Sequence, residues 1–229
     1  MIDIFDAARA ARTPTLFGAT TLLREDTSLV TDRRVRTLYP PWKYAGLQAT
    51  ARTARDTDQT VARENLARQV AQVAAMLRGG GVVITGTDSP IANRAVSTHL
   101  NLRAMVKYPV SPYDALTTAT RAPGEFLGEP LGTVRPGTYA DLVVLGGDPL
   151  ADITAAADVR QVMCNGELFD VDGLLAPFVS GAAGERLRAR SRPVSRLADP
   201  VPDPPANRRY WWHDPHYVEE SRHTCCQES

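Results

Sequence analysis

The sequence contains few cysteines and no long apolar segment. Three cysteines in 229 residues are too few for a disulfide framework, and the adjacent Cys225 and Cys226 cannot easily bridge each other. No apolar run approaches the roughly 20 residues that a membrane span needs. Residues 1–6 lack the basic flank and the apolar core of a signal peptide. We therefore expect a cytoplasmic protein without a membrane partner.

An excess of charge of either sign is also absent. Twenty-six basic residues balance twenty-six acidic ones, and the sequence pI is about 6.9. This balance argues against a broad electrostatic surface for nucleic acid, so we expect no nucleic-acid partner. The 43% share of hydrophobic residues and the mean hydropathy of -0.24 describe a chain that can bury a core.

The first half of the chain contains one strong helical pattern. Apolar residues recur at helical spacing between residues 59 and 78, and they are Val61, Leu66, Val70, Val73 and Leu77. Before this helix, residues 13–17 form a short β-type run. Residues 18–58 show no regular pattern, and connections of this length are often lids or binding loops. We therefore predict a long loop there.

An apolar strand is predicted immediately after this helix. Residues 82–85 are apolar and β-branched without alternation, which is typical of a parallel strand covered on both faces. Helical patterns then cover residues 92–107 and 112–127. The order helix, strand, helix predicts an α/β fold class.

The pattern changes to short β-hairpins beyond residue 130. Residues 131–134 and 140–145 predict one hairpin, and residues 159–164 and 167–169 predict a second, with Asn165-Gly166 as its turn. Arginine and proline then dominate the end of the chain. We therefore divide the chain into a segment at 1–128, a β-module at 129–171 and a flexible tail at 172–229.

Asp88 is the main candidate for chemistry. It follows the predicted buried strand, and the carboxyl ends of parallel strands carry the active sites of α/β barrels. A carboxylate there can bind a metal ion or accept a proton from water. The local alternative is a helix N-cap, because Ser89-Pro90 follows and also suits the start of a helix.

Several motifs in order resemble the metal-dependent amidohydrolase superfamily, in particular the branch of imidazolonepropionase- and prolidase-like enzymes. The motifs are TGTDS at 85–89, HLNL at 99–102, SPYDALTTAT at 111–120 and GTVRPGTYADLVVL at 132–145. The chain departs at Thr138, where the family commonly has lysine. The resemblance implies the C-terminal part of a (β/α)8 TIM-like barrel plus part of a small β-sandwich composite domain. Strand seven would then be residues 13–17 and strand eight residues 82–88.

The resemblance also implies an activity and its residues. Such enzymes hydrolyse carbon-nitrogen bonds other than peptide bonds in small molecules, using water activated by a divalent metal such as zinc. Asp88 would be metal ligand and general base. His99, Tyr39 and Trp42 would bind substrate. The alternative for His99 is a packed structural histidine, and for Tyr39 and Trp42 it is ordinary aromatic packing.

The remaining ligands of the family site have no counterpart in this chain. That site needs histidines on strands one, five and six, and no histidine precedes His99 here. One carboxylate cannot replace them. We therefore expect a truncated protein or half of a split enzyme, inactive and metal-free alone, whose partner is an upstream half-barrel or a second copy. The alternative is a non-catalytic remnant or interaction module.

Overall fold

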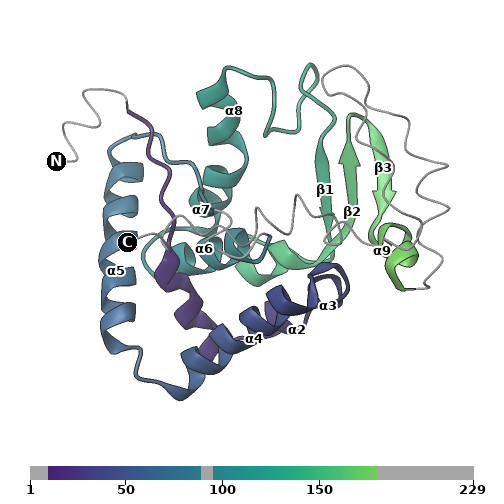
Figure 1. The fold of residues 1–229 in the computed structure, drawn as a ribbon. Coiled ribbons are helices and arrows are strands. Elements are labelled where there is room, and N and C mark those ends of the chain that lie inside the picture. Colours follow the sequence, from purple (N-terminus) through teal and green to yellow (C-terminus); the bar gives the residue numbers. More distant parts are fainter. Residues whose placement is uncertain (1–9, 89–94, 180–229) are drawn as a thin grey trace, which may run out of the picture.

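A computed structural model of the chain describes residues 10–88 and 95–179. Its helices are η1 (Phe17–Arg24), α2 (Ser28–Thr31), α3 (Arg33–Leu38), α4 (Pro41–Asp56), α5 (Thr60–Arg78), α6 (Val96–Lys107), α7 (Pro112–Ala119), α8 (Arg121–Leu127), η2 (Ile153–Ala157) and α9 (Val171–Val179). Its strands are β1 (Leu142–Leu145), β2 (Val159–Cys164) and β3 (Glu167–Asp170). The fold is mixed α/β and mostly helical, with a small antiparallel sheet at one side (Figure 1).

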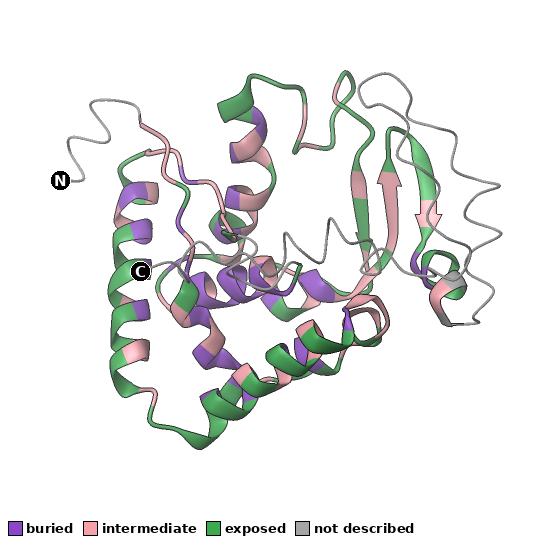
Figure 2. Cartoon of the chain, in the orientation of Figure 1, coloured by how far each residue is buried: buried purple, intermediate pink, exposed green. Residues whose placement is uncertain are grey.

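The hydrophobic core lies among the helices and not in the sheet. Figure 2 shows the buried residues gathered on the facing sides of the helices. The largest fully buried apolar side chains are Leu23, Leu47, Leu66, Leu100, Met76 and Met105. In contrast, every residue of β1, β2 and β3 is at least partly exposed. The helical part therefore contains most of the packing that stabilises the described chain.

The prediction of a long loop at residues 18–58 is wrong. This region forms η1, α2, α3 and α4. Helix α4 begins at Pro41, which is favoured in the first helical turn, and it buries Leu47, Ala51 and Ala54. These three residues have helical spacing, but two of them are alanines, so the apolar pattern was too weak to stand out.

The predicted helix at residues 59–78 is confirmed as α5. Leu66, Val70 and Val73 are buried as expected. Val61 is 69% exposed, so its place in the apolar stripe is wrong. It precedes Leu66 by five residues, which turns it about 140° away on an ideal helix.

The two expected parallel strands are present only as a short pairing. Arg12 and Val83 form a parallel bridge. The Arg12 amide donates to the carbonyl of Val82 at 3.0 Å, and the Ile84 amide donates to the carbonyl of Arg12 at 2.9 Å. The predicted strand at residues 13–17 is wrong: the bridge lies at Arg12, just before this range, and η1 already begins at Phe17.

The second predicted hairpin is confirmed, and the first is wrong. Strands β2 and β3 pair antiparallel across Asn165 and Gly166, whose φ angles of 51° and 80° suit a tight hairpin turn. Strand β1 pairs with β2 and not with residues 131–134. Those residues pack on the helices instead: a Cβ on Gly132 would lie 2.1 Å from the carbonyl oxygen of Thr120.

The tail predicted from residue 172 begins as a helix. Residues 172–179 belong to α9, in which Leu175 is buried, and Asp172 forms an ion pair with Arg33 of α3. Residues 180–229, the rest of the predicted tail, lie outside the described residues. Among the residues described, no helix is long and apolar enough to cross a membrane.

Candidate functional site

Asp88 follows the short parallel pairing, as the sequence predicts. Its side chain is exposed, and its φ angle of 46° lies in the left-handed region that non-glycine residues rarely adopt. Among the described residues, none forms a hydrogen bond or an ion pair with it. The carboxylate is therefore accessible. Ser89 and Pro90, on which the N-cap alternative depends, lie outside the described residues.

The backbone just before Asp88 is held from three sides. The Gly86 amide donates to the carbonyl of Pro14 at 3.2 Å. The Asn101 side-chain amide of α6 donates to the carbonyl of Gly86. The Thr85 amide donates to the carbonyl of Thr118 in α7 at 2.9 Å, and the hydroxyl groups of these two threonines also share a hydrogen bond. Sequence reasoning did not single out Asn101 or Thr118, although both lie within the quoted motifs.

The structure places His99 on a different side of α6 from Asn101. Two residues along a helix correspond to a rotation of about 200°, and Asn101 faces the strand that leads to Asp88. Burial, with a smaller contribution from the positive charges of Arg103 and Arg34, lowers the pKa of His99 to about 4. The imidazole is therefore neutral at pH 7, and the structure does not bring it together with Asp88.

Tyr39 and Trp42 lie at the junction of α3 and α4. Tyr39 follows the last residue of α3 and packs, partly buried, against the hydrophobic core. Trp42 is in the first turn of α4 and is 48% exposed. These two aromatic residues are thus part of helical packing or its edge, and not of the long loop that the sequence predicted.

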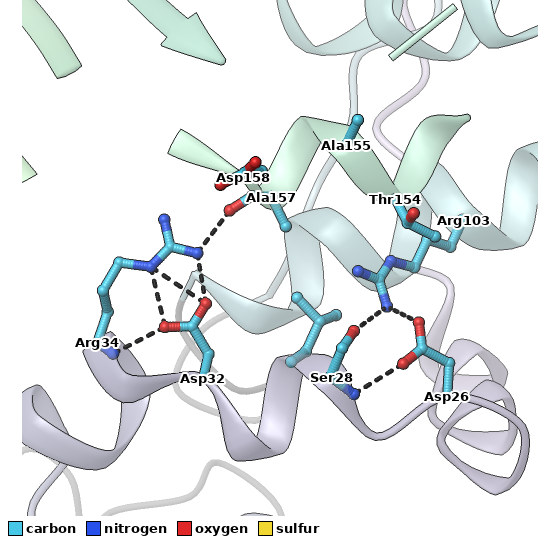
Figure 3. Close-up of a pocket in the computed structure, with 10 residues that line it drawn as sticks. Asp26, Ser28, Asp32, Arg34, Arg103, Thr154, Ala155, Ala157 and Asp158 are labelled. Atoms are coloured by element: carbon cyan, nitrogen blue, oxygen red, sulfur yellow. Dashed lines mark hydrogen bonds and ion pairs between the residues drawn. The ribbon is translucent and has the colours of Figure 1, made fainter. Parts of the chain in front are cut away.

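A cavity of about 480 Å³ lies elsewhere, between α2, α3, α6 and η2 (Figure 3). Four of its charged groups pair with one another: Arg34 binds Asp32, and Arg103 binds Asp26 with 2.6 Å between Nη1 and Oδ2. Asp158, which also lines the cavity, pairs with Arg160. Burial opposes ionisation of Asp26, but hydrogen bonds from Ser28 and the charge of Arg103 outweigh it and hold the pKa of Asp26 below its usual value. The cavity lining does not include Asp88.

The described residues do not fit a complete metal site. Within residues 10–88 and 95–179, no group of three histidine, cysteine, aspartate or glutamate side chains could hold a metal ion. Asp88 supplies one oxygen donor group, whereas structural and catalytic zinc sites use three or four protein ligands. No catalytic step can therefore be assigned to a metal from these residues alone.

Comparison with known proteins identifies one family. The profile of the amidohydrolase family matches residues 17–169. No curated protein matches the sequence.

Several solved structures are similar in part. A structure of an amidohydrolase has 22% sequence identity and a TM-score of 0.46, over 74% of this chain and 36% of that chain. A Xaa-Pro dipeptidase with methionine bound in its active site has 19% identity and a TM-score of 0.47, over 74% of this chain and 36% of the dipeptidase chain. A molinate hydrolase has 20% identity and a TM-score of 0.43, over 86% of this chain and 39% of the hydrolase chain. The chain thus spans little more than a third of the length of these proteins.

Proposed function

This chain belongs to the amidohydrolase family, and from that premise we propose that the whole protein hydrolyses carbon-nitrogen bonds other than peptide bonds in a small-molecule substrate. The observation that carries the proposal is the position of Asp88. Asp88 is an exposed carboxylate that follows the short parallel pairing of Arg12 with Val83. It lies inside the region that the family profile matches.

Asp88 would act as the general base in this reaction. An exposed carboxylate can accept a proton from the attacking water when it lies within hydrogen-bond reach of that water. The backbone that leads to it is held at Thr85 and Gly86 by hydrogen bonds with Pro14, Asn101 and Thr118. His99, Tyr39 and Trp42 remain candidate substrate-binding residues.

The divalent metal implied by the resemblance, zinc, would need ligands from outside the described residues. Asp88 would be the ligand that this chain contributes. The partner that supplies the others would be an upstream half-barrel, or a second copy of the chain. The cytoplasmic location and the division at residues 128 and 171 stay predictions.

A matched pair of variants tests the proposed function. The chain is co-expressed with the segment encoded upstream and assayed with zinc or manganese against hydantoins, lactams and dipeptides. Replacing the general base, Asp88→Asn, should lower kcat by about a thousandfold, while Asp56→Asn, at an exposed aspartate that pairs with Arg55, should leave kcat unchanged. Equal activity of both variants would remove Asp88 from the mechanism.

A non-catalytic interaction module is the second candidate. It is favoured by the three-stranded sheet, whose residues are all at least partly exposed, since a sheet of this size needs a covered face for independent stability. In that case the co-expressed protein should form a stable complex without hydrolysing any substrate in the presence of metal.

A further inference from the structure

We propose that Asn101 is a positioning residue for Asp88. This inference rests on the proposed role of Asp88 as the catalytic carboxylate, and it concerns a residue that does not itself touch substrate. Asn101 is 2% exposed on α6, and its side-chain amide donates a hydrogen bond to the carbonyl of Gly86, two residues before Asp88.

The Gly86 carbonyl needs this donor because the neighbouring segment, residues 12–16, turns away from it. The parallel pairing continues as far as the bond from the Gly86 amide to the carbonyl of Pro14. The next donor along that segment would be the Leu16 amide, but the chain enters η1 at Phe17, and among the described residues the Leu16 amide forms no hydrogen bond with the Gly86 carbonyl. The Asn101 amide therefore continues the ladder in place of a strand.

Gly86 itself cannot shift to find another partner. A Cβ at this position would lie 2.6 Å from Cγ2 of Thr13 and 3.3 Å from Oγ1 of Thr15, so the two chain segments are in close contact here. On the other side, the preceding residue Thr85 is bonded to the fully buried Thr118 through both its amide and its hydroxyl group. The carbonyl of Gly86 is thus directed at Asn101.

The backbone conformation of Asp88 depends on such external support. A left-handed φ angle at a non-glycine residue costs energy and persists where the surroundings hold it. Asn101 supplies such support, because its side chain donates a hydrogen bond to the Gly86 carbonyl, two residues before Asp88. Loss of this bond would let Gly86, Thr87 and Asp88 move together, which would displace the carboxylate without removing it.

Nuclear magnetic resonance of the full chain tests this role without any need for turnover. Asn101→Leu keeps the approximate volume but removes the donor. The backbone amide resonances of Thr87 and Asp88 should then shift, and their hydrogen exchange should accelerate about tenfold or more because the local opening becomes easier. Leu102→Ala is the matched control: it removes another buried side chain of α6 (4% exposed) but keeps the hydrogen bond, so these two amides should stay as in the wild type.

A second variant separates the hydrogen bond from general packing. Asn101→Asp has no donor when ionised and one O–H donor when protonated, and burial raises the pKa of such a carboxyl group. The Thr87 and Asp88 resonances of this variant should therefore approach the wild-type positions as the pH is lowered. Those of Asn101→Leu should show no such return. Packing alone would not produce this pH dependence.

Unchanged Thr87 and Asp88 amides in Asn101→Leu would overturn the proposal. If that variant does not fold, the wild type decides: the Asn101 side-chain protons should exchange about a hundredfold more slowly than those of an exposed asparagine, and fast exchange would overturn the proposal. Because Asp88→Asn tests turnover and these spectra test position, failure of the proposed function and failure of this inference give different results.

Discussion

Among single residues, His99 shows most clearly how burial changes chemistry. Its pKa falls to about 4 because partial burial and the positive charges of Arg103 and Arg34 disfavour the imidazolium form, so the folded chain favours the neutral form. The unfolded chain binds the proton more tightly. Folding stability from this group is therefore complete above about pH 6.5 and is lost as the pH falls towards 4, by on the order of 3 kcal/mol.

Urea unfolding between pH 7 and pH 4.5 measures this loss. His99→Gln cannot titrate, so its stability should fall less over the same range than that of the wild type. Taking the difference between the two proteins removes the contributions of Asp26, Asp32 and all other groups that both share. Parallel curves for wild type and variant would show that His99 is not the group responsible.

Two glycines give a second prediction at the same scale. Gly86→Ala should destabilise the chain by about 1–3 kcal/mol, because the new Cβ would overlap Thr13. Gly46→Ala, within α4 where a Cβ meets nothing within 4 Å, should stabilise it by about 1 kcal/mol. Thermal unfolding of both variants checks the signs. If both substitutions destabilised the chain, the close packing of Gly86 would not be the cause of the loss in Gly86→Ala.

At the scale of elements, α4 packs on the hydrophobic core through Leu47, Ala51 and Ala54. Leu47 is 1% exposed in the core, so Leu47→Ala should cost roughly 2–5 kcal/mol of folding stability. Trp42→Ala, at a residue 48% exposed, should cost much less. Urea unfolding with detection by circular dichroism provides the comparison. Similar small losses of stability in both variants would indicate that residues 41–56 do not pack on the core.

The elements also show which structures the sequence can predict. Helix α5 and the β2–β3 hairpin follow from local signals, namely a stripe of large apolar residues and an Asn-Gly turn. Helix α4 was missed because alanine carries much of its buried face. The pairing of β1 with β2 could not be found locally, because the two strands are separated by the η2 segment.

The candidate site also contains some residues that the sequence predicts and others that it does not. Asp88 was found because it ends an apolar run, which is visible in the sequence. The contacts of Asn101 and Thr118 depend on how α6 and α7 pack against that run, and no local pattern specifies this. Similarly, His99 and Asp88 are close in sequence, yet the charges that act on His99 are those of Arg103, Arg34 and Asp32.

For the whole molecule, the exposed sheet is the feature that most affects behaviour in solution. The backbone at Thr85 is covered by Thr118, and Val83 is 1% exposed. Among the described residues, β1 pairs only with β2, and Val143 is 56% exposed. Unpaired strand edges with apolar residues promote association.

We therefore expect the chain alone to self-associate through this sheet. Val143→Lys should reduce association in size-exclusion chromatography with light scattering, because a charge on an edge strand opposes pairing. Val61→Lys, at a 69% exposed valine of α5, is the control and should have no effect. A sharp monomer of 24.9 kDa for the unmodified chain would contradict this expectation.

The proposed function requires that this chain contribute Asp88 to an amidohydrolase whose remaining ligands lie outside the described residues. The direct measurement is metal-dependent hydrolysis by the 229-residue chain alone, by the chain co-expressed with its upstream segment, and by the same pair carrying Asp88→Asn. We expect background activity for the chain alone, turnover for the pair, and loss of that turnover in the variant pair. Turnover by the chain alone, or turnover of the pair that survives Asp88→Asn, would refute the proposed role of Asp88.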